Sequence, residues 1–171
     1  MLHQEPTKGY EIRKDIDNSN SYLFVTDHLI VYQVYFKYSP NYLFKDSAYS
    51  HYVYEFVIAV LENPADSLPI FDKKTSITIT SIFEEFCQTF QEAIVVYICD
   101  SSDGRQMIRH RKFNAWFNEY NTDKFTKQDC ILKEYNGISN PMSLIINKKH
   151  PFSYQIMEEF KITIDGYNLG K

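Results

Sequence analysis

The chain has 171 residues and a formal net charge of −4, and hydrophobic residues make up 44% of it. A chain of this length buries about 70% of its unfolded surface, so it needs neither a disulfide nor a structural metal to fold. Its three cysteines are odd in number and widely spaced, which excludes a disulfide framework and the close ligand pairs of a zinc site. Reduced cysteines, no N-terminal signal pattern and no apolar run of about 18 residues predict a cytoplasmic protein without a membrane span.

Aromatic residues are frequent, with 14 tyrosines and 13 phenylalanines. Their rings bury large areas, and tyrosine keeps a polar tip that needs a partner. This composition favours tyrosine-rich strand surfaces. The alternative is a stacking surface for bases or for a protein partner.

Charge is distributed unevenly along the chain. Residues 1–100 carry 7 Lys/Arg and 14 Asp/Glu, whereas residues 101–171 carry 11 and 8. The C-terminal part is therefore locally basic inside an acidic protein. Such a region can steer an anionic partner at close range.

We predict an N-terminal tail over residues 1–9 and a single domain over residues 10–167. Polar and apolar residues alternate in much of the first part, which is the pattern of half-buried strands. Strands are predicted at 10–14, 22–26, 29–38 and 51–61. The last of these is apolar on both faces, which indicates a central position in the sheet.

Residues 75–91 combine two patterns. Residues 76–80 alternate like a strand, yet the larger apolar residues of the segment fall on one face of a helix. We predict a helix here, and the two patterns do not define its first residue. Ser81 and Glu84 have the spacing of a capping box, which favours a start there.

The other predicted elements are a strand over 93–99, a helix over 105–120, a hairpin of 130–135 and 142–147, and a final helix. Pro151 favours the start of that helix and Gly166 its end, because proline suits the first helical position and glycine the C-terminus. The order of elements predicts an α+β fold, in which a mostly antiparallel sheet carries about three helices on one face.

The sequence contains no phosphate-binding loop, dinucleotide fingerprint, nucleophile elbow or zinc-protease motif. The five histidines are not clustered along the chain, so each is interpreted as a surface or hydrogen-bonded residue rather than a catalyst. We predict no cofactor and no metal site. Catalytic residues are not assigned, and the sequence leaves open whether the protein is an enzyme.

The best-marked segment runs from Cys99 to Phe117. Its first part, Asp100-Ser-Ser-Asp-Gly104, consists of turn and N-cap residues, and glycine permits a close backbone approach. The first amides of the following helix have no internal partners and offer a site for an anion. Four cations then occur within eight residues, before any acid: Arg105, Arg109, Arg111 and Lys112.

Three of these cations and the single tryptophan fall on one stripe of the helix, because each residue turns it by about 100°. Arg105 lies in the first turn, where a cation opposes the helix dipole. Asp100 or Asp103 can compensate its charge locally, or a bound phosphate can. The predicted anion-binding residues are Ser101, Ser102, Gly104, Arg105, Arg109 and Lys112. Trp116 is predicted to stack on a base or ring, with core packing as its alternative.

The Asp-Ser-Ser-Asp-Gly-Arg turn and the Arg-x-Arg-Lys-Phe-x-x-Trp-Phe helix after it resemble an uncharacterised bacterial family of unknown function. The order of elements over roughly residues 10–165 resembles that family too. The resemblance implies a stand-alone bacterial domain and no known activity. Small bacterial proteins of this kind are often associated with toxin–antitoxin or defence loci.

The sequence therefore favours a domain that binds RNA or another phosphate-bearing ligand. An RNase-type component of a toxin–antitoxin or defence system is one form of this hypothesis. A second hypothesis is a non-enzymatic protein-interaction module, like an antitoxin or immunity protein, because the first 100 residues are strongly acidic. A third is a binder of a small phosphate-bearing molecule.

Overall fold

A computed structural model describes residues 7–65, 67–69 and 71–171. Residues 1–6 of the predicted tail lie outside this range. The chain divides into two compact units. Unit 1 comprises Met1–Phe36 and Val57–Thr89, and unit 2 comprises Lys37–Phe56 and Phe90–Lys171. Each unit is described by itself.

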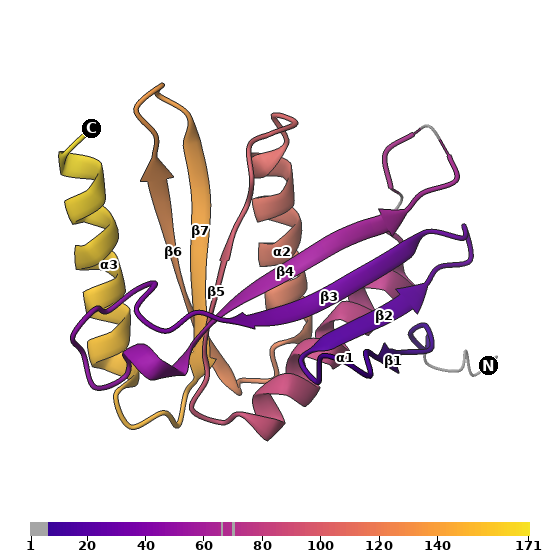
Figure 1. The fold of residues 1–171 in the computed structure, drawn as a ribbon, viewed down its shortest axis with the longest axis horizontal. Helices are drawn as coiled ribbons and strands as arrows, with labels where there is room; N and C mark the ends of the chain where they lie inside the picture. The colour runs from indigo at the N-terminus through magenta and orange to yellow at the C-terminus, as the bar shows by residue number, and fades with distance from the viewer. Residues whose placement is uncertain (1–6, 66, 70) are drawn as a thin grey trace, which may run out of the picture. The chain divides into compact units, whose positions relative to one another are not determined.

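The described residues form an α+β fold with seven strands and three α-helices, as the sequence predicts (Figure 1). The strands are β1 (Arg13–Lys14), β2 (Ser21–Val25), β3 (Val31–Tyr38), β4 (Val53–Glu62), β5 (Ile94–Ile98), β6 (Phe125–Lys133) and β7 (Ser139–Asn147). The helices are α1 (Lys73–Thr89), α2 (Gln106–Tyr120) and α3 (Ser153–Leu169). The strand order is β1-β2-β3-β4-β5-β7-β6. β2 pairs antiparallel with β1 and β3, β7 pairs antiparallel with β5 and β6, and β4 pairs parallel with β5. β4 is thus central, which confirms the prediction from its two apolar faces.

Unit 1 is built on the alternation in β2 and β3. Tyr22, Phe24, Tyr32, Val34 and Phe36 are buried, while the residues between them are more exposed. Helix α1 covers the buried face, where the rings of Phe36 and Phe86 stack with centroids 3.7 Å apart. The predicted strand pattern is therefore confirmed, although β1 is only two residues long.

Helix α1 begins earlier than the capping-box spacing predicts. Asp72 Oδ1 accepts hydrogen bonds from Thr75 N at 2.7 Å and Thr75 Oγ1 at 2.9 Å, so Asp72 is the capping residue. Ser81 instead donates its hydroxyl to the carbonyl of Ile77 within the helix. The strand-like residues 76–80 are helical because the helical face that includes Ile79 and Ile82 is buried.

Unit 2 has a sheet of β5, β7 and β6 between two helices (Figure 1). Ile156, Phe160 and Ile164 of α3 pack with residues of one sheet face, such as Val96 and Leu144. Helix α2 lies on the other face. The ring of Phe113 meets the ring of Tyr97 edge-on at 5.5 Å there. The prediction that the helices cover one face is therefore wrong, because alternate residues of these strands point to opposite sides and both sides are covered.

The hairpin of β6 and β7 is longer and tighter than predicted. β6 begins at Phe125 rather than near residue 130, and β7 already begins at Ser139. Pro141 therefore lies inside β7, although proline lacks a ladder N–H. Its carbonyl still accepts a hydrogen bond from Cys99 N at 2.8 Å, near the end of the β5 pairing.

Two further element boundaries differ from the sequence-based expectation. A short 3-10 helix, Ser50–Tyr52, precedes β4, so that strand begins at Val53. Helix α3 passes through Gly166 and continues to Leu169. Glycine in a helix interior costs about 1 kcal/mol relative to alanine. The residues after Gly166 make contacts, described below, that offset this cost. Within the described part of the chain, no helix is long and apolar enough to cross a membrane.

Candidate functional site

The predicted turn connects β5 to α2 and is held by its own acidic side chains. Asp100 Oδ1 accepts a hydrogen bond from Ser102 N at 3.1 Å, and Ser102 Oγ donates to Asp100 Oδ2. Gly104 has φ +71° and its N–H donates to Ser101 O at 3.0 Å. Open space surrounds the position where a Gly104 side chain would start, so glycine is needed here for its backbone conformation.

Arg109 is paired inside the turn. Its Nη1 lies 2.8 Å from Asp103 Oδ1 and its Nη2 lies 2.5 Å from Asp103 Oδ2, while Nη1 also donates to Asp100 O at 2.9 Å. Asp103 Oδ1 further accepts the backbone N–H of Arg105 at 3.1 Å. The hydrogen bond from Arg109 holds the pKa of Asp103 below its usual value. The Asp103 carboxylate thus binds the Arg109 guanidinium and the Arg105 N–H, which are the groups that the anion-site hypothesis assigns to a bound anion.

Arg105 and Lys112 are the other two cations of the predicted stripe. Arg105 is the N-cap residue of α2, and its half-buried side chain makes no hydrogen bond or ion pair with the described residues. Burial, together with the charge of Arg105, lowers the pKa of Lys112. These two cations therefore lie close enough to repel each other, and Arg105 lies at the positive end of the helix. Arg111, on the outer side of α2, is exposed.

Trp116 is half-buried and packs against Phe113, with ring centroids 5.4 Å apart and planes inclined by 49°. Phe113 in turn contacts Tyr97 of β5. The tryptophan is thus part of the aromatic contacts that extend from α2 to the sheet. Its role as a stacking platform stays a prediction.

A second polar group of residues lies between α2 and the sheet, and we call it the α2–β6 cluster: His110, Asn114, Lys127, Asp129 and Ser143. Lys127 Nζ donates to Asn114 Oδ1 and to Asp129 Oδ1, and only 6% of its side chain is exposed. Ser143 Oγ donates to Asp129 Oδ1 at 2.6 Å. Burial lowers the pKa of Lys127, which Asp129 opposes. Burial raises the pKa of Asp129, but the bonds from Lys127 and Ser143 outweigh it and the pKa is lowered.

The contacts of Asn114 define the tautomer of neutral His110. Asn114 Oδ1 accepts from Lys127, so its Nδ2 is the atom 3.1 Å from His110 Nε2. An amide nitrogen only donates, hence Nε2 is the acceptor and the ring proton is on Nδ1. Nδ1 is buried without a partner among the described residues, and burial lowers the pKa of His110. His110 Nε2 is also 4.0 Å from Asp129 Oδ2.

The α2–β6 cluster explains how α2 is attached to the sheet. None of the residues of α2 is fully buried. Its half-buried aromatic rings are supplemented by the hydrogen bonds of Asn114. Sequence reasoning missed this cluster, because its members come from three elements. The only local signal was that Lys127 and Asp129, which carry opposite charges, stand at alternate positions and so on the same face of one strand.

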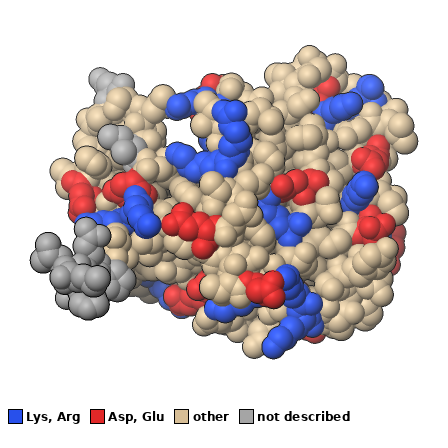
Figure 2. All heavy atoms as spheres, turned by 180° about the vertical axis from the view of Figure 1, so that it is seen from behind, with Lys and Arg blue, Asp and Glu red and all other residues tan. Residues whose placement is uncertain are grey.

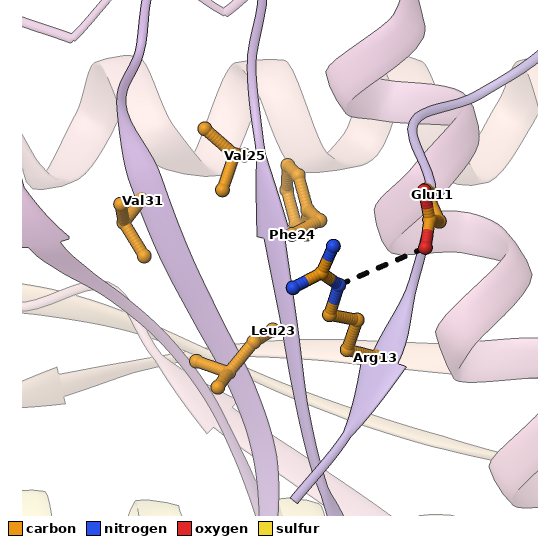
Figure 3. A pocket seen from close by; sticks show the side chains of 6 residues that line it. All are labelled: Glu11, Arg13, Leu23, Phe24, Val25 and Val31. Atoms are coloured by element: carbon orange, nitrogen blue, oxygen red, sulfur yellow. Dashed lines mark ion pairs between the residues drawn. The ribbon is translucent and has the colours of Figure 1, made fainter.

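Unit 1 has a shallow depression of about 300 Å³ beside β1 and β2 (Figure 3). Leu23, Val25 and Val31 line it with apolar groups. Arg13 and Glu11 flank it, with Arg13 Nε 3.7 Å from Glu11 Oε1, and both are largely exposed. Phe24 also lines it, so the lining combines an apolar surface with one exposed charge pair.

The cysteines and His150 lie in surroundings that are typical of structural rather than catalytic residues. All three cysteines are free thiols, and burial raises the pKa of Cys87 to about 12 and that of Cys99 to about 11. His150 is buried and its Nδ1 accepts from Phe152 N at 3.1 Å. Among the described residues, no three His, Cys, Asp or Glu side chains are grouped as metal ligands.

Comparison with known proteins identifies one family. A family model described as "Family of unknown function (DUF6169)" matches residues 71–162, which is more than half of the chain. The match includes α1, β5, α2, the β6–β7 hairpin and the whole α2–β6 cluster. Neither a curated protein nor a solved structure matches the chain significantly. The turn, the basic helix and the cluster beneath it are thus features of a chain that belongs to DUF6169, a family of unknown function.

Proposed function

We propose that the protein binds a phosphate-bearing polyanion, with single-stranded RNA as the first choice, through Arg105, Arg111 and Lys112. The observation that carries this proposal is the position of Arg105. Arg105 is the N-cap residue at the positive end of α2, and its side chain has no acid partner among the described residues. Burial lowers the pKa of Lys112, and the charge of Arg105 adds to this effect. An anion between the two cations removes their repulsion, and a guanidinium binds phosphate with two parallel hydrogen bonds.

The binding groups in this proposal are side chains rather than helix amides. Asp100 and Asp103 accept the N–H groups of Ser102 and Arg105, and they repel an anion that approaches the turn itself. Binding is therefore centred on the Arg105–Lys112 flank of α2. Ser101, Ser102, Gly104 and Arg109 contribute by holding the turn.

The surface charge favours local contacts over long-range attraction. Figure 2 shows Lys and Arg side chains interspersed with Asp and Glu on one face of the molecule. The overall charge of −4 does not attract nucleic acid from a distance. We therefore expect weak affinity that depends strongly on salt.

RNA cleavage, in an RNase-type component of a toxin–antitoxin or defence system, is a further form of this proposal. A metal-free reaction needs acid–base groups near the bound phosphate. The α2–β6 cluster supplies His110 on the same helix as the cations, and Tyr97 lies beside Lys127, whose Nζ is 5.9 Å from its ring centroid. Incubating labelled RNA with the wild type and with His110→Gln tests it: cleavage that the variant loses supports an enzyme.

Fluorescence anisotropy of labelled poly(U) and poly(dT) at several salt concentrations tests binding. For single strands, each phosphate contact contributes about 0.7 to the slope of log affinity against log salt. Arg105→Ala/Lys112→Ala should therefore flatten the slope by about 1.4. Lys45→Ala/Lys161→Ala removes the same charge from exposed positions outside α2 and should leave the slope nearly unchanged.

Three outcomes of the anisotropy experiment are informative. If the wild type binds inorganic phosphate or ATP but not the oligonucleotides, and Arg105→Ala/Lys112→Ala loses this binding, the ligand is a small molecule. If both double variants flatten the slope of log affinity against log salt equally, binding is not specific to the Arg105–Lys112 flank of α2. No binding of any of these ligands at low salt overturns the proposal.

The second candidate function is a protein-interaction module, and the depression beside β1 and β2 favours it. Val25 is 51% exposed at its lining, and an aliphatic surface with a charged rim is typical of protein contacts. Quantitative pull-down from native extract with wild type, Val25→Arg and the exposed loop control Leu68→Arg tests this candidate. A stoichiometric partner lost only with Val25→Arg supports it, and equal recovery with all three proteins contradicts it.

A further inference from the structure

β6 is the last strand in the order, so one of its two edges has no strand beside it in the described part of the chain. Its pairing with β7 shows which residues point their backbone groups to that edge. Ile131 O and Lys133 N bond to α3 rather than to β7. Backbone groups of alternate residues share one edge of a strand, so the outward residues are Phe125, Lys127, Asp129, Ile131 and Lys133. Asn121 bonds to both backbone groups of Phe125.

The end of α3 covers part of this edge with side chains. Asn168 Oδ1 accepts from Lys133 N at 2.8 Å, and Asn168 Nδ2 donates to Ile131 O at 2.7 Å. One amide that bonds to the O of a residue and to the N two positions later imitates one residue of a parallel strand. Lys171 Nζ donates to Lys133 O at 2.5 Å. Asn168 and Lys171 thus occupy three ladder positions.

A fourth position is also occupied from within β6. Gln128 Nε2 donates to Asp129 O at 3.0 Å. The outward carbonyls of Asp129, Ile131 and Lys133 therefore each accept a hydrogen bond from a side chain. An uncovered edge is a template for pairing with another chain, and these side chains block it.

Apart from these hydrogen bonds, Lys171 Nζ lies 5.4 Å from the centroid of the exposed Tyr135 ring. The final turn of α3 has little apolar burial of its own. The last fully buried residue of α3 is Ile164, while Tyr167 is 55% and Leu169 is 89% exposed. The final turn therefore loses little apolar burial when it detaches. Segments of this kind open at low free-energy cost.

The side chains on the edge suit pairing with a second copy of the same chain. In an antiparallel pair centred on Ile131, this residue faces itself, and Asp129 of each copy faces Lys133 of the other. Opposite charges directly across an antiparallel pair are favourable. Ile131 is 38% exposed, so its side chain is available for the contact.

We propose that the β6 edge is a dimerisation surface for a second copy of this chain, and that Asn168 and Lys171 keep it closed. Opening of the last turn of α3 exposes the backbone groups of Ile131 and Lys133 to the same strand of another molecule. For the pair to extend to Asp129, Gln128 must also release Asp129 O. The two sheets then continue into each other through an antiparallel β6–β6 pair. This inference is independent of the proposed ligand.

The test is sedimentation velocity of the full chain over a range of concentrations. Asn168→Ala/Lys171→Ala should lower the dimer dissociation constant about tenfold relative to the wild type, the effect of one or two hydrogen bonds. Asn118→Ala/Lys161→Ala changes the same residue types at exposed helix positions and should leave it unchanged. Asn168→Asp keeps an acceptor for Lys133 N, but it replaces the donor to Ile131 O with a carboxylate oxygen and adds a negative charge. It therefore opens the same contact with a side chain of nearly the same size.

The pairing register has its own variant. Adding Lys133→Glu to Asn168→Ala/Lys171→Ala places an acid opposite Asp129 of the other copy. The dimer dissociation constant should then return towards that of the wild type. A dimer dissociation constant that Lys133→Glu leaves unchanged overturns the β6–β6 register. No gain in dimer for either Asn168 variant, with circular dichroism unchanged, overturns the proposal.

Discussion

Asp103 and Arg109 form a bidentate ion pair across the turn that leads into α2, with N–O distances of 2.8 and 2.5 Å. The pair uses the carboxylate to satisfy both the guanidinium and the backbone N–H of Arg105. One of the three cations in the predicted stripe is thereby neutralised. The relationship makes Asp103 an internal substitute for a bound anion.

Removing that internal anion should strengthen ligand binding. Asp103→Asn eliminates a negative charge beside the site and frees Arg109, so the affinity for poly(U) should rise. The slope of log affinity against log salt should become steeper by about 0.7, the effect of one added phosphate contact. Asp123→Asn, which removes an exposed carboxylate paired with Lys148, is the matched control. Weaker binding by Asp103→Asn would instead show that the turn must be intact.

The same substitution at two glycines should have opposite effects on stability. Gly104 has φ +71°, so Gly104→Ala should lower the free energy of unfolding by about 1 kcal/mol. Gly166 lies inside α3 with open space where an alanine Cβ would lie, so Gly166→Ala should raise the free energy of unfolding by about 0.5–1 kcal/mol. Urea unfolding at neutral pH measures both, and equal signs would contradict the backbone argument.

Breaking the ion pair in the α2–β6 cluster should destabilise unit 2. Lys127→Met leaves the Asp129 carboxylate without its ammonium partner. We expect a loss of about 2 kcal/mol, below the 3–5 kcal/mol of fully buried pairs because Asp129 is 40% exposed. Lys127→Met/Asp129→Leu should recover part of this loss. A double variant as unstable as the sum of both single variants would show that the two side chains are not coupled.

Stability should fall as the pH decreases from 7 towards 5. Burial lowers the pKa of His110 and of His150 in the folded state. The unfolded chain, with histidine pKa near 6.5, therefore binds protons first, and this favours unfolding at lower pH. Asp129, whose folded pKa is also lowered, adds a further loss below about pH 4.

Thermal unfolding between pH 7 and 5 checks this expectation. His110→Gln/His150→Gln should flatten the dependence of the melting temperature on pH. His28→Gln/His51→Gln changes two exposed histidines and should leave the dependence as it is. A decline of the same steepness in the double variant of the buried histidines would mean that other groups cause it.

Part of the fold follows from local patterns in the chain. The alternation in β2 and β3, the apolar run of β5 and the helical periodicity of α1 all predict the elements that form. Boundaries were less predictable. Ser81 has the spacing of a cap, but Asp72 caps α1, because burial of the intervening residues favours the longer helix. Gly166 resembles a helix end, yet Asn168 needs the next turn to reach β6.

The sequence by itself determined the α+β class, the order of elements and the concentration of cations at the start of α2. These properties depend on periodicity and composition over a few residues. Only the tertiary structure decided that Arg109 pairs with Asp103, that Lys127 meets Asn114 under α2, and that Asn168 closes the β6 edge. Polar side chains bind whichever partner the fold brings within hydrogen-bond distance, and for Lys127 and Asn168 that partner lies on an element distant in sequence.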